Sequence, residues 1–214
     1  MSAQRDTRDA GRITGIVLAA GAARRFGAAK LVAAVHGRPI ITHVVDAVLA
    51  AGLACIVVVD AADPGPVRDA LEGRTVTLVK NEQATTGLAS SIRAGIGQVP
   101  AETQAVILLL GDQPTLGAGL LRRLVDQWRT GDSRIVVPEF RGQRGPPALF
   151  SRSTFPELVQ LEGDEGARRV VDRDPGRVSI CAIDAPMPPD IDTPADLDAM
   201  ERAAPERSSS GDRQ

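Results

Sequence analysis

The hydrophobic positions of this chain alternate between short continuous runs and stretches with helical spacing. Residues 13–20, ITGIVLAA, form an unbroken apolar run before a glycine, which is typical of a strand buried on both faces of a sheet. In residues 39–52, apolar side chains recur at helical spacing between a proline and a glycine, which predicts a helix. Further strands are expected at 55–60, 76–79, 105–110 and 134–138, and further helices within 64–73, 87–97 and 120–128.

This alternation predicts the fold class. Strands separated by helices favour a mostly parallel sheet with helices on both faces, so we expect a single-domain α/β protein with a Rossmann-like, three-layer αβα fold. A chain of 214 residues, 43% of them hydrophobic, is long enough for one domain with a sizeable core. The polar, aperiodic ends predict disordered tails at residues 1–12 and 204–214 around a folded domain at 13–203.

The composition argues against several classes of function. A formal net charge of −2 and an aromatic content of 2% disfavour nucleic-acid binding. No apolar run approaches the roughly twenty residues of a membrane helix, and the amino terminus lacks the apolar core of a signal peptide, so we expect a cytoplasmic protein without membrane contact. Cys55 and Cys181 each lie in an apolar run, which favours buried thiols over nucleophiles.

The segment after the first predicted strand, residues 18–30 (LAAGAARRFGAAK), combines glycines with cations. Gly21 and Gly27 allow backbone conformations in which amides turn toward an oxyanion, and Arg25 and Lys30 would neutralise phosphate charge. The spacing fits neither a P-loop, whose lysine follows its second glycine directly, nor the dinucleotide fingerprint, whose glycines stand closer together. From these residues alone, a phosphate site and a glycine-rich turn with solvated arginines are both open.

Two later segments supply carboxylates, and the first of them is expected at the same edge of the sheet as residues 18–30. Asp112 follows the apolar run 105–110 in the sequence GDQP, and Asp190 and Asp192 lie in DIDTP near the carboxyl end. Ligands of open parallel sheets bind beyond the carboxyl ends of the strands, and one carboxylate from each segment together with phosphate oxygens suits Mg²⁺. The alternatives are structural: Asp112 would start a turn, and Thr193 would cap a helix.

Together, these segments resemble the MobA-like nucleotidyltransferase family, and within it most of all the molybdenum cofactor cytidylyltransferases. The resemblance spans roughly residues 13–200, with LAAGAARRFGAAK, GLASSIRAG, LLLGDQP, GPPALF, GDEGARRVV and DIDTPADL in the family's order. It implies a nucleotidyltransferase fold and an enzyme that moves a nucleotidyl group, CMP from CTP by preference, onto the phosphate of molybdopterin and releases pyrophosphate. The expected cofactor is Mg²⁺, and the expected partners are an NTP, a phosphorylated pterin acceptor and a molybdoenzyme or its maturation chaperone.

The same resemblance assigns roles to individual residues. Arg25, Lys30 and Asp112 are expected to be catalytic, with the two cations on the phosphates, and Asp112 and Asp192 are expected to hold the metal. The segments GPPALF and GDEGARRVV are expected to face the acceptor. The residues expected to bind the nucleotide are Leu18, Ala19, Ala20, Gly21, Arg25, Lys30, Gly87, Ser91 and Asp112.

Two positions, Ala20 and Pro146, bear on which function of the family this chain has. Ala20 stands where guanylyl-transferring relatives tend to have glycine, which favours cytidine, with a guanylyltransferase as the alternative. Pro146 replaces the histidine of a GHP pattern, which keeps open a family member resembling nicotine blue oxidoreductase with NAD(P)H in the nucleotide pocket. A third alternative is a non-catalytic cofactor carrier. The presence of Lys30, Asp112 and Asp192 argues against it, because an inert carrier would tolerate their loss.

Overall fold

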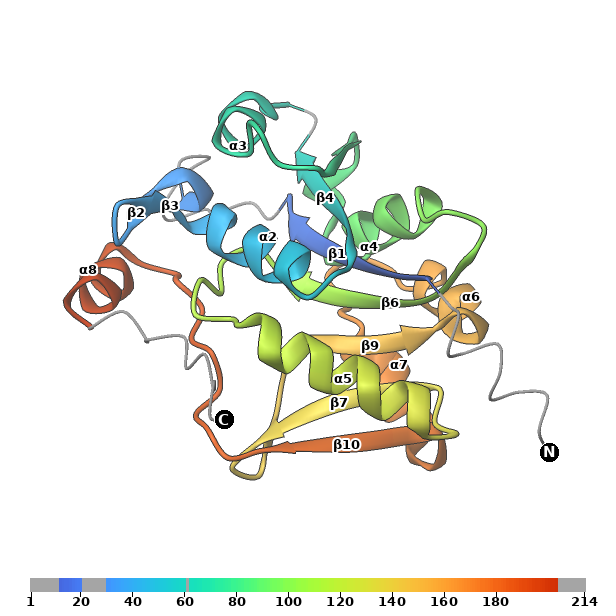
Figure 1. The fold of residues 1–214 in the computed structure, drawn as a ribbon. Coiled ribbons are helices and arrows are strands. Elements are labelled where there is room, and N and C mark those ends of the chain that lie inside the picture. The colour runs from blue at the N-terminus through green and yellow to red at the C-terminus, as the bar shows by residue number, and fades with distance from the viewer. Residues whose placement is uncertain (1–11, 21–29, 61, 204–214) are drawn as a thin grey trace.

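An eight-stranded mixed sheet forms the middle layer of the protein, with helices on both faces (Figure 1). The computed structural model describes residues 12–20, 30–60 and 62–203. The strands of the sheet are β1 (Arg12–Ala19), β4 (Ala54–Asp60), β5 (Thr77–Asn81), β6 (Thr103–Leu110), β7 (Ile135–Phe140), β8 (Gln143–Arg144), β9 (Ala148–Ser151) and β10 (Val178–Ile183). The α-helices are α2 (Ile40–Ala50), α3 (Gly65–Ala70), α4 (Leu88–Gly97), α5 (Ala118–Thr130), α6 (Phe155–Val159), α7 (Arg168–Asp172) and α8 (Pro194–Arg202).

The sheet has the strand order β10-β7-β9-β6-β1-β4-β5, with β8 paired to β7. Strands β6, β1, β4 and β5 run parallel, as do β7 and β10, which confirms the predicted mostly parallel sheet. The antiparallel strand β9, between β6 and β7, was not predicted. Only residues 141–147 separate β7 from β9. A connection this short permits an antiparallel pair but not the crossover that parallel strands need.

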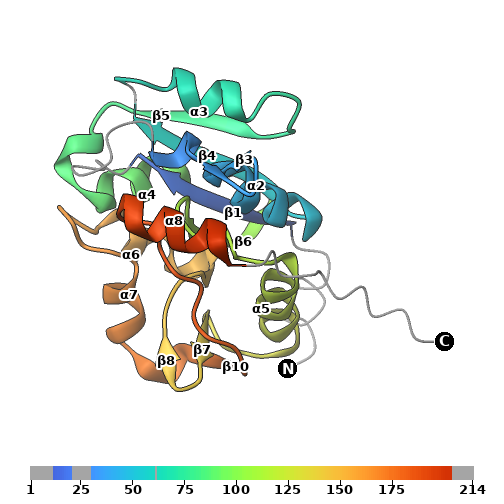
Figure 2. The ribbon, with the colours of Figure 1, turned by 90° about the vertical axis from the view of Figure 1, so that its left-hand side faces the viewer.

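The core consists of two hydrophobic clusters, one on each face of the sheet. Helices α2 and α5 cover one face, and α4, α6 and α7 cover the other, which is the predicted three-layer arrangement (Figures 1 and 2). Along β1, Val17 packs into the first cluster, whereas Ile16 and Leu18 pack into the second. Burial on both faces explains why the strand is apolar without alternation. No helix in the described ranges is long and apolar enough to cross a membrane.

The carboxyl ends of β1 and β6 lie side by side and define the edge at which the site forms. Leu18 pairs with Leu110 in the parallel register, and the amide of Gly111 donates to the carbonyl of Leu18 over 3.0 Å. A Cβ on Gly111 would come within 3.2 Å of that carbonyl, so the turn after β6 packs tightly on β1. The predicted convergence of these strand ends is confirmed.

A smaller element closes the same edge of the molecule. It combines the 3₁₀ turn η1 (Lys30–Val32), the hairpin of β2 (Ala34–Val35) and β3 (Arg38–Pro39), and α8. Ile191, fully buried, packs with Val35 and Ile40, and Leu197 of α8 packs against this group. Helix α8 begins as the sequence predicts, because the Thr193 hydroxyl accepts from the amide of Asp196 in a capping box. The segment before α8 is thereby held beside the end of β6.

Candidate active site

Lys30, Asp112 and Asp192 form one ion-paired cluster at the carboxyl edge of the sheet. The Lys30 Nζ donates to Asp112 Oδ2 over 2.8 Å and to Asp192 Oδ1 over 2.9 Å. The three residues come from η1, from the turn after β6 and from the segment before α8. The structure therefore brings together three of the residues that the sequence singled out.

The cluster is buried unevenly, and this decides its electrostatics. The side chain of Lys30 is 10% exposed and that of Asp112 is 22% exposed, whereas that of Asp192 is 67% exposed. Burial alone would lower the pKa of Lys30, but its hydrogen bonds to Asp112 and Asp192 outweigh burial and raise the pKa. Lys30 is therefore a fixed positive charge at neutral pH.

The oxygen atoms of the cluster fit a hard divalent cation. Asp112 Oδ1 is buried and has no hydrogen-bond partner among the described residues, which leaves a carboxylate oxygen available as a ligand. The described ranges contain no group of three or more His, Cys, Asp or Glu side chains that could hold a metal. Two carboxylates completed by substrate oxygens suit Mg²⁺, which is usually bound by one or two carboxylates plus phosphates.

The segment that carries Asp192 is tied to the turn that carries Asp112. The amide of Ile191 donates to the carbonyl of Asp112 over 3.1 Å, and Gln113 Nε2 donates to Asp190 Oδ1 over 2.8 Å. Partial burial raises the pKa of Asp190, the nearby Asp112 adds to the rise, and the hydrogen bond from Gln113 opposes it. Sequence reasoning assigned no role to Gln113, although it lies in the GDQP motif.

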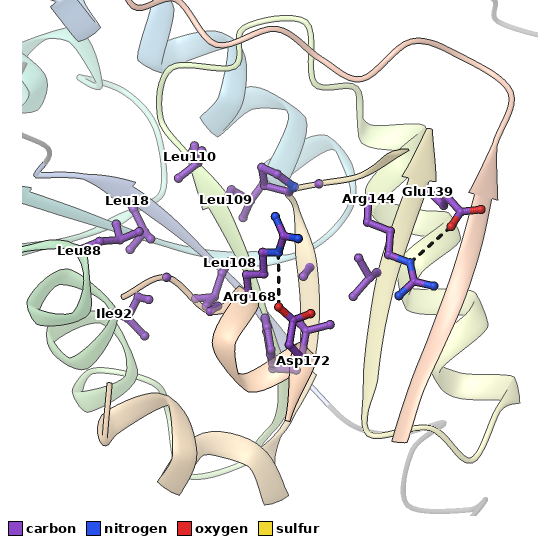
Figure 3. Close-up of a pocket in the computed structure, with 18 of the residues that line it drawn as sticks. Leu18, Leu88, Ile92, Leu108, Leu109, Leu110, Glu139, Arg144, Arg168 and Asp172 are labelled. Carbon is purple, nitrogen blue, oxygen red and sulfur yellow. Dashed lines mark hydrogen bonds and ion pairs between the residues drawn. The ribbon is translucent and has the colours of Figure 1, made fainter. Parts of the chain in front are cut away.

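A cavity of about 700 Å³ opens beside this edge (Figure 3). Leu18 and Leu110, at the carboxyl ends of β1 and β6, line it. The cluster of Lys30, Asp112 and Asp192 is not part of the lining, and Asp112 follows Leu110 by two residues. Figure 3 shows aliphatic side chains of β1, α4 and β6 on one side and charged side chains of β7, β8 and α7 on the other. Both segments that the resemblance places at the acceptor contribute to the lining: Gly145, Pro146, Ala148 and Phe150 from GPPALF, and Gly166, Ala167, Arg168 and Val171 from GDEGARRVV.

Two arginines stand in the charged wall of this cavity. Arg144 pairs with Glu139, and Arg168 pairs with Asp172, each over 3.4 Å (Figure 3). Their side chains are 56% and 89% exposed, so these pairs are weak and leave both guanidinium groups able to reach an anion. The cavity thus combines an aliphatic wall with one that carries two arginines and their two acidic partners.

The remaining nucleotide-binding predictions fall in different environments. Gly87 adopts a φ of 112° at the start of α4, and a Cβ there would come within 2.2 Å of the Gly163 carbonyl, so only glycine lets these backbones meet. The Ser91 side chain is buried and accepts a hydrogen bond from Asn81 Nδ2 over 3.0 Å, so its hydroxyl is held inside the protein. Ala19 and Ala20 are buried at the end of β1.

Some predicted residues lie outside the described part of the chain. These are Gly21 and Arg25, together with both predicted tails except Arg12, the first residue of β1. Cys55 and Cys181 are buried free thiols, as predicted. Burial raises the pKa of Cys55 to about 12, so this thiol is not an activated nucleophile.

Comparison with known protein families decides what kind of protein carries this site. The family profile of the MobA-like NTP transferase domain matches residues 15–178, well over half of the chain. The chain belongs to this family. The matched range covers β1 from Gly15 onward, the turn with Asp112 and the segments that line the cavity, whereas Asp192 lies beyond it.

Individual relatives cover nearly the whole chain. Purine catabolism protein PucB of Bacillus subtilis (strain 168) is 29% identical over 203 residues, which cover 89% of this chain and 97% of that protein. Nicotine blue oxidoreductase of Paenarthrobacter nicotinovorans is 27% identical over 199 residues, covering 89% and 94%. Membership of the MobA-like NTP transferase family supports nucleotidyltransferase activity.

A solved structure shares both the fold and recognisable sequence. Rv0371c from Mycobacterium tuberculosis H37Rv matches with a TM-score of 0.82 and 30% identity, over 90% of this chain and 98% of that one. A second structure of Rv0371c is a complex with manganese, and it matches with a TM-score of 0.79 and 29% identity over 90% and 99% of the two chains.

Proposed function

We propose that this protein transfers a nucleotidyl group from an NTP to a phosphorylated acceptor, with CTP as donor and the phosphate of molybdopterin as acceptor. One observation carries this proposal: Lys30, Asp112 and Asp192 form one ion-paired cluster at the carboxyl edge of the sheet, and Leu110, two residues before Asp112, lines a cavity of about 700 Å³. Cation and carboxylates at one point are what a metal-bound triphosphate requires, because the phosphates need a positive charge and the metal needs oxygen ligands.

The chemistry needs no general base in the protein. A terminal phosphate has its second pKa near 6, so it is largely ionised at neutral pH and attacks the α-phosphorus directly. The protein must instead align the two phosphates and stabilise the charge that develops on the leaving pyrophosphate. Lys30 keeps its positive charge at neutral pH. Its ammonium group would move from the carboxylates to the phosphate oxygens as the triphosphate binds.

Asp112 and Asp192 would hold the divalent cation, which we propose to be Mg²⁺. When bound, this cation neutralises the phosphate charge and orients the triphosphate. The unpaired Oδ1 of Asp112 supports this assignment, as does the manganese complex of Rv0371c, a protein 29% identical to this one. Mn²⁺ and Mg²⁺ share a preference for oxygen ligands.

The cavity supports an acceptor that combines an apolar or planar body with negative charge. Its aliphatic wall would pack against the body, and Arg144 and Arg168 lie where they could pair with anionic groups. A phosphorylated pterin has both features. The choice of CTP rests on the sequence resemblance and on Ala20.

The proposal is tested by calorimetric titration of the purified protein with CTP, GTP, ATP and NADPH, each with and without Mg²⁺. We expect CTP to bind with Mg²⁺ and to bind more weakly without it. Asp112→Asn serves as the matched variant, because it keeps the side-chain shape and removes one charge. NADPH binding of equal affinity with and without Mg²⁺, together with no binding of any NTP, would refute the proposal. It would favour the redox activity named for the relative from Paenarthrobacter nicotinovorans.

A further inference from the structure

The two carboxylates of the site come from distant parts of the chain, so their relative position must be set by contacts between the two segments. Asp112 lies in the turn after β6, and Asp192 lies in the segment before α8. One backbone hydrogen bond, from Ile191 to Asp112, joins the segments directly. The only side chain of the turn with a hydrogen bond to this segment within the described residues is that of Gln113.

Gln113 binds the segment at two points. Its Nε2 donates to Asp190 Oδ1 over 2.8 Å and lies 3.3 Å from the carbonyl of Pro188. Both partners are acceptors, so only the amide nitrogen can face them, and the orientation of the amide is settled by its surroundings. Asp190 is the first residue of DIDTP, and Pro188 lies two residues before it, so these contacts hold the chain immediately before Asp192.

Gln113 is buried, and its amide group accounts for a polar side chain at this position. The residue is 1% exposed, and its Oε1 is buried without a hydrogen-bond partner among the described residues. An unpaired buried acceptor destabilises a fold, so an aliphatic side chain of similar size would fill the position at lower cost. The hydrogen bonds of Nε2 to Asp190 and Pro188 therefore explain why a glutamine occupies this position although its Oε1 has no partner among the described residues.

We propose that Gln113 is a positioning residue, which fixes Asp192 relative to Asp112 by fastening Asp190 to the turn after β6. This inference rests on the proposed function, because it takes Asp112 and Asp192 as the pair that binds the divalent cation. Gln113 touches neither substrate nor metal in this role and acts through the backbone between residues 190 and 192. Partners that orient metal ligands affect affinity strongly, with losses of about 10-fold to 100-fold when they are replaced.

The substitution Gln113→Glu separates positioning from simple electrostatics. A glutamate adds negative charge near the site, which on Coulombic grounds alone would tighten the binding of a cation. The same glutamate faces Asp190 and the Pro188 carbonyl with no hydrogen to donate, so it would push the segment away. Positioning therefore predicts weaker cation binding, and electrostatics predicts stronger binding.

The experiment measures Mn²⁺ binding to the full-length protein by electron paramagnetic resonance, which reports the free ion, without nucleotide. We expect Gln113→Glu to weaken Mn²⁺ binding by about 10-fold or more. We expect the double variant Gln113→Glu/Asp190→Asn to recover most of the affinity, because an asparagine amide would donate to the new glutamate. Asp190→Asn alone keeps an acceptor for Gln113 and should stay much closer to wild type than Gln113→Glu.

Gln104→Glu is the matched control, since Gln104 lies near the opposite end of β6 and makes the same change of charge. Thermal unfolding of every variant shows whether it folds. If Gln113→Glu does not fold, Gln113→Met tests the same idea without added charge and should also weaken Mn²⁺ binding. Wild-type affinity in a folded Gln113 variant, or no recovery in the double variant, would overturn the inference.

The measurement also keeps this inference apart from the proposed function. A wild-type protein that binds Mn²⁺ but no NTP would refute the proposed transfer and leave the role of Gln113 supported by the variants. A wild-type protein that binds no Mn²⁺ in the absence of nucleotide would overturn the positioning role but not the proposed transfer, in which phosphate oxygens help to hold the cation. Binding of both ligands by wild type, with no effect of Gln113→Glu, would overturn only the positioning role.

Discussion

Replacing Lys30 by methionine should destabilise the protein and at the same time improve its response to a divalent cation. Methionine has nearly the length of lysine but no charge, so the variant removes the ammonium group between Asp112 and Asp192 while keeping most of the packing. The two carboxylates are then left without their shared partner. A divalent cation would compensate them, because it would bind the same oxygens without competition from Lys30.

The size of the effect follows from the unequal burial of the two ion pairs. The pair with Asp192 is 67% exposed on the carboxylate side and contributes about 0–1 kcal/mol, since water and salt screen it. Removing one partner of a fully buried pair costs about 3–5 kcal/mol. Because Asp112 retains 22% exposure, we expect a total loss of about 2–3 kcal/mol. For a domain of this size, this corresponds to a fall in Tm of about 4–12 °C.

The assay is thermal unfolding at pH 7 with and without millimolar Mn²⁺, in the absence of nucleotide. Mn²⁺ should raise the Tm of Lys30→Met more than that of wild type, because the stabilisation by a ligand grows with the logarithm of its affinity. Lys80→Met, at an exposed lysine of β5, is the control and should change neither value. A Lys30→Met variant with wild-type Tm, or one that gains less from Mn²⁺ than wild type, would refute this account of the cluster.

Three further predictions concern other parts of the structure. Asp112→Asn should abolish nucleotidyl transfer with the fold retained, and unchanged turnover would remove Asp112 from the mechanism. Hydrogen bonds from Arg177 lower the pKa of Glu157, so this stabilisation is present above the ordinary value of 4.5 and disappears as the pH falls through the lowered pKa. Glu157→Gln should therefore reduce the free energy of unfolding by about 1–2 kcal/mol at pH 7. Denaturant titrations would measure this difference, and the free energies of variant and wild type should become equal in acid. Gly87→Ala should cost at least about 1–3 kcal/mol, because a Cβ strains the positive φ and meets the Gly163 carbonyl; an unchanged Tm would contradict that packing.

The sequence predicts the part of the site that depends on strand order and residue type. Buried parallel strands are recognisable as apolar runs, and their carboxyl ends share one edge, so the sequence alone places Lys30 and Asp112 near each other. The capping box at Thr193 is likewise a local pattern, and the structure contains it. The apolar runs and the capping box involve residues close together in the chain, so the sequence is sufficient to predict them.

Other features depend on contacts between distant residues, and sequence patterns do not contain them. Ser91 was expected at the nucleotide, but its environment is set by Asn81, which reaches it from the end of β5. The importance of Gln113 emerges only when the segment around Asp190 is seen against the turn after β6. A glutamine in a turn motif can have many roles. The burial of Gln113 and its hydrogen bonds to Pro188 and Asp190 indicate which role it has here.

The sequence by itself determined the α/β class, the strands β1, β4, β5, β6 and β7 with the helices α2 to α5 between them, and the residue types available for binding phosphate and metal. It did so because hydrophobic periodicity and turn chemistry are local properties of the chain. Only the tertiary structure decided the insertion of antiparallel β9, the unequal burial of the two aspartates that share Lys30, and the cavity beside them. The ion pairs of Lys30 join residues more than eighty positions apart in the chain, and their packing sets the exposure and electrostatics of the site.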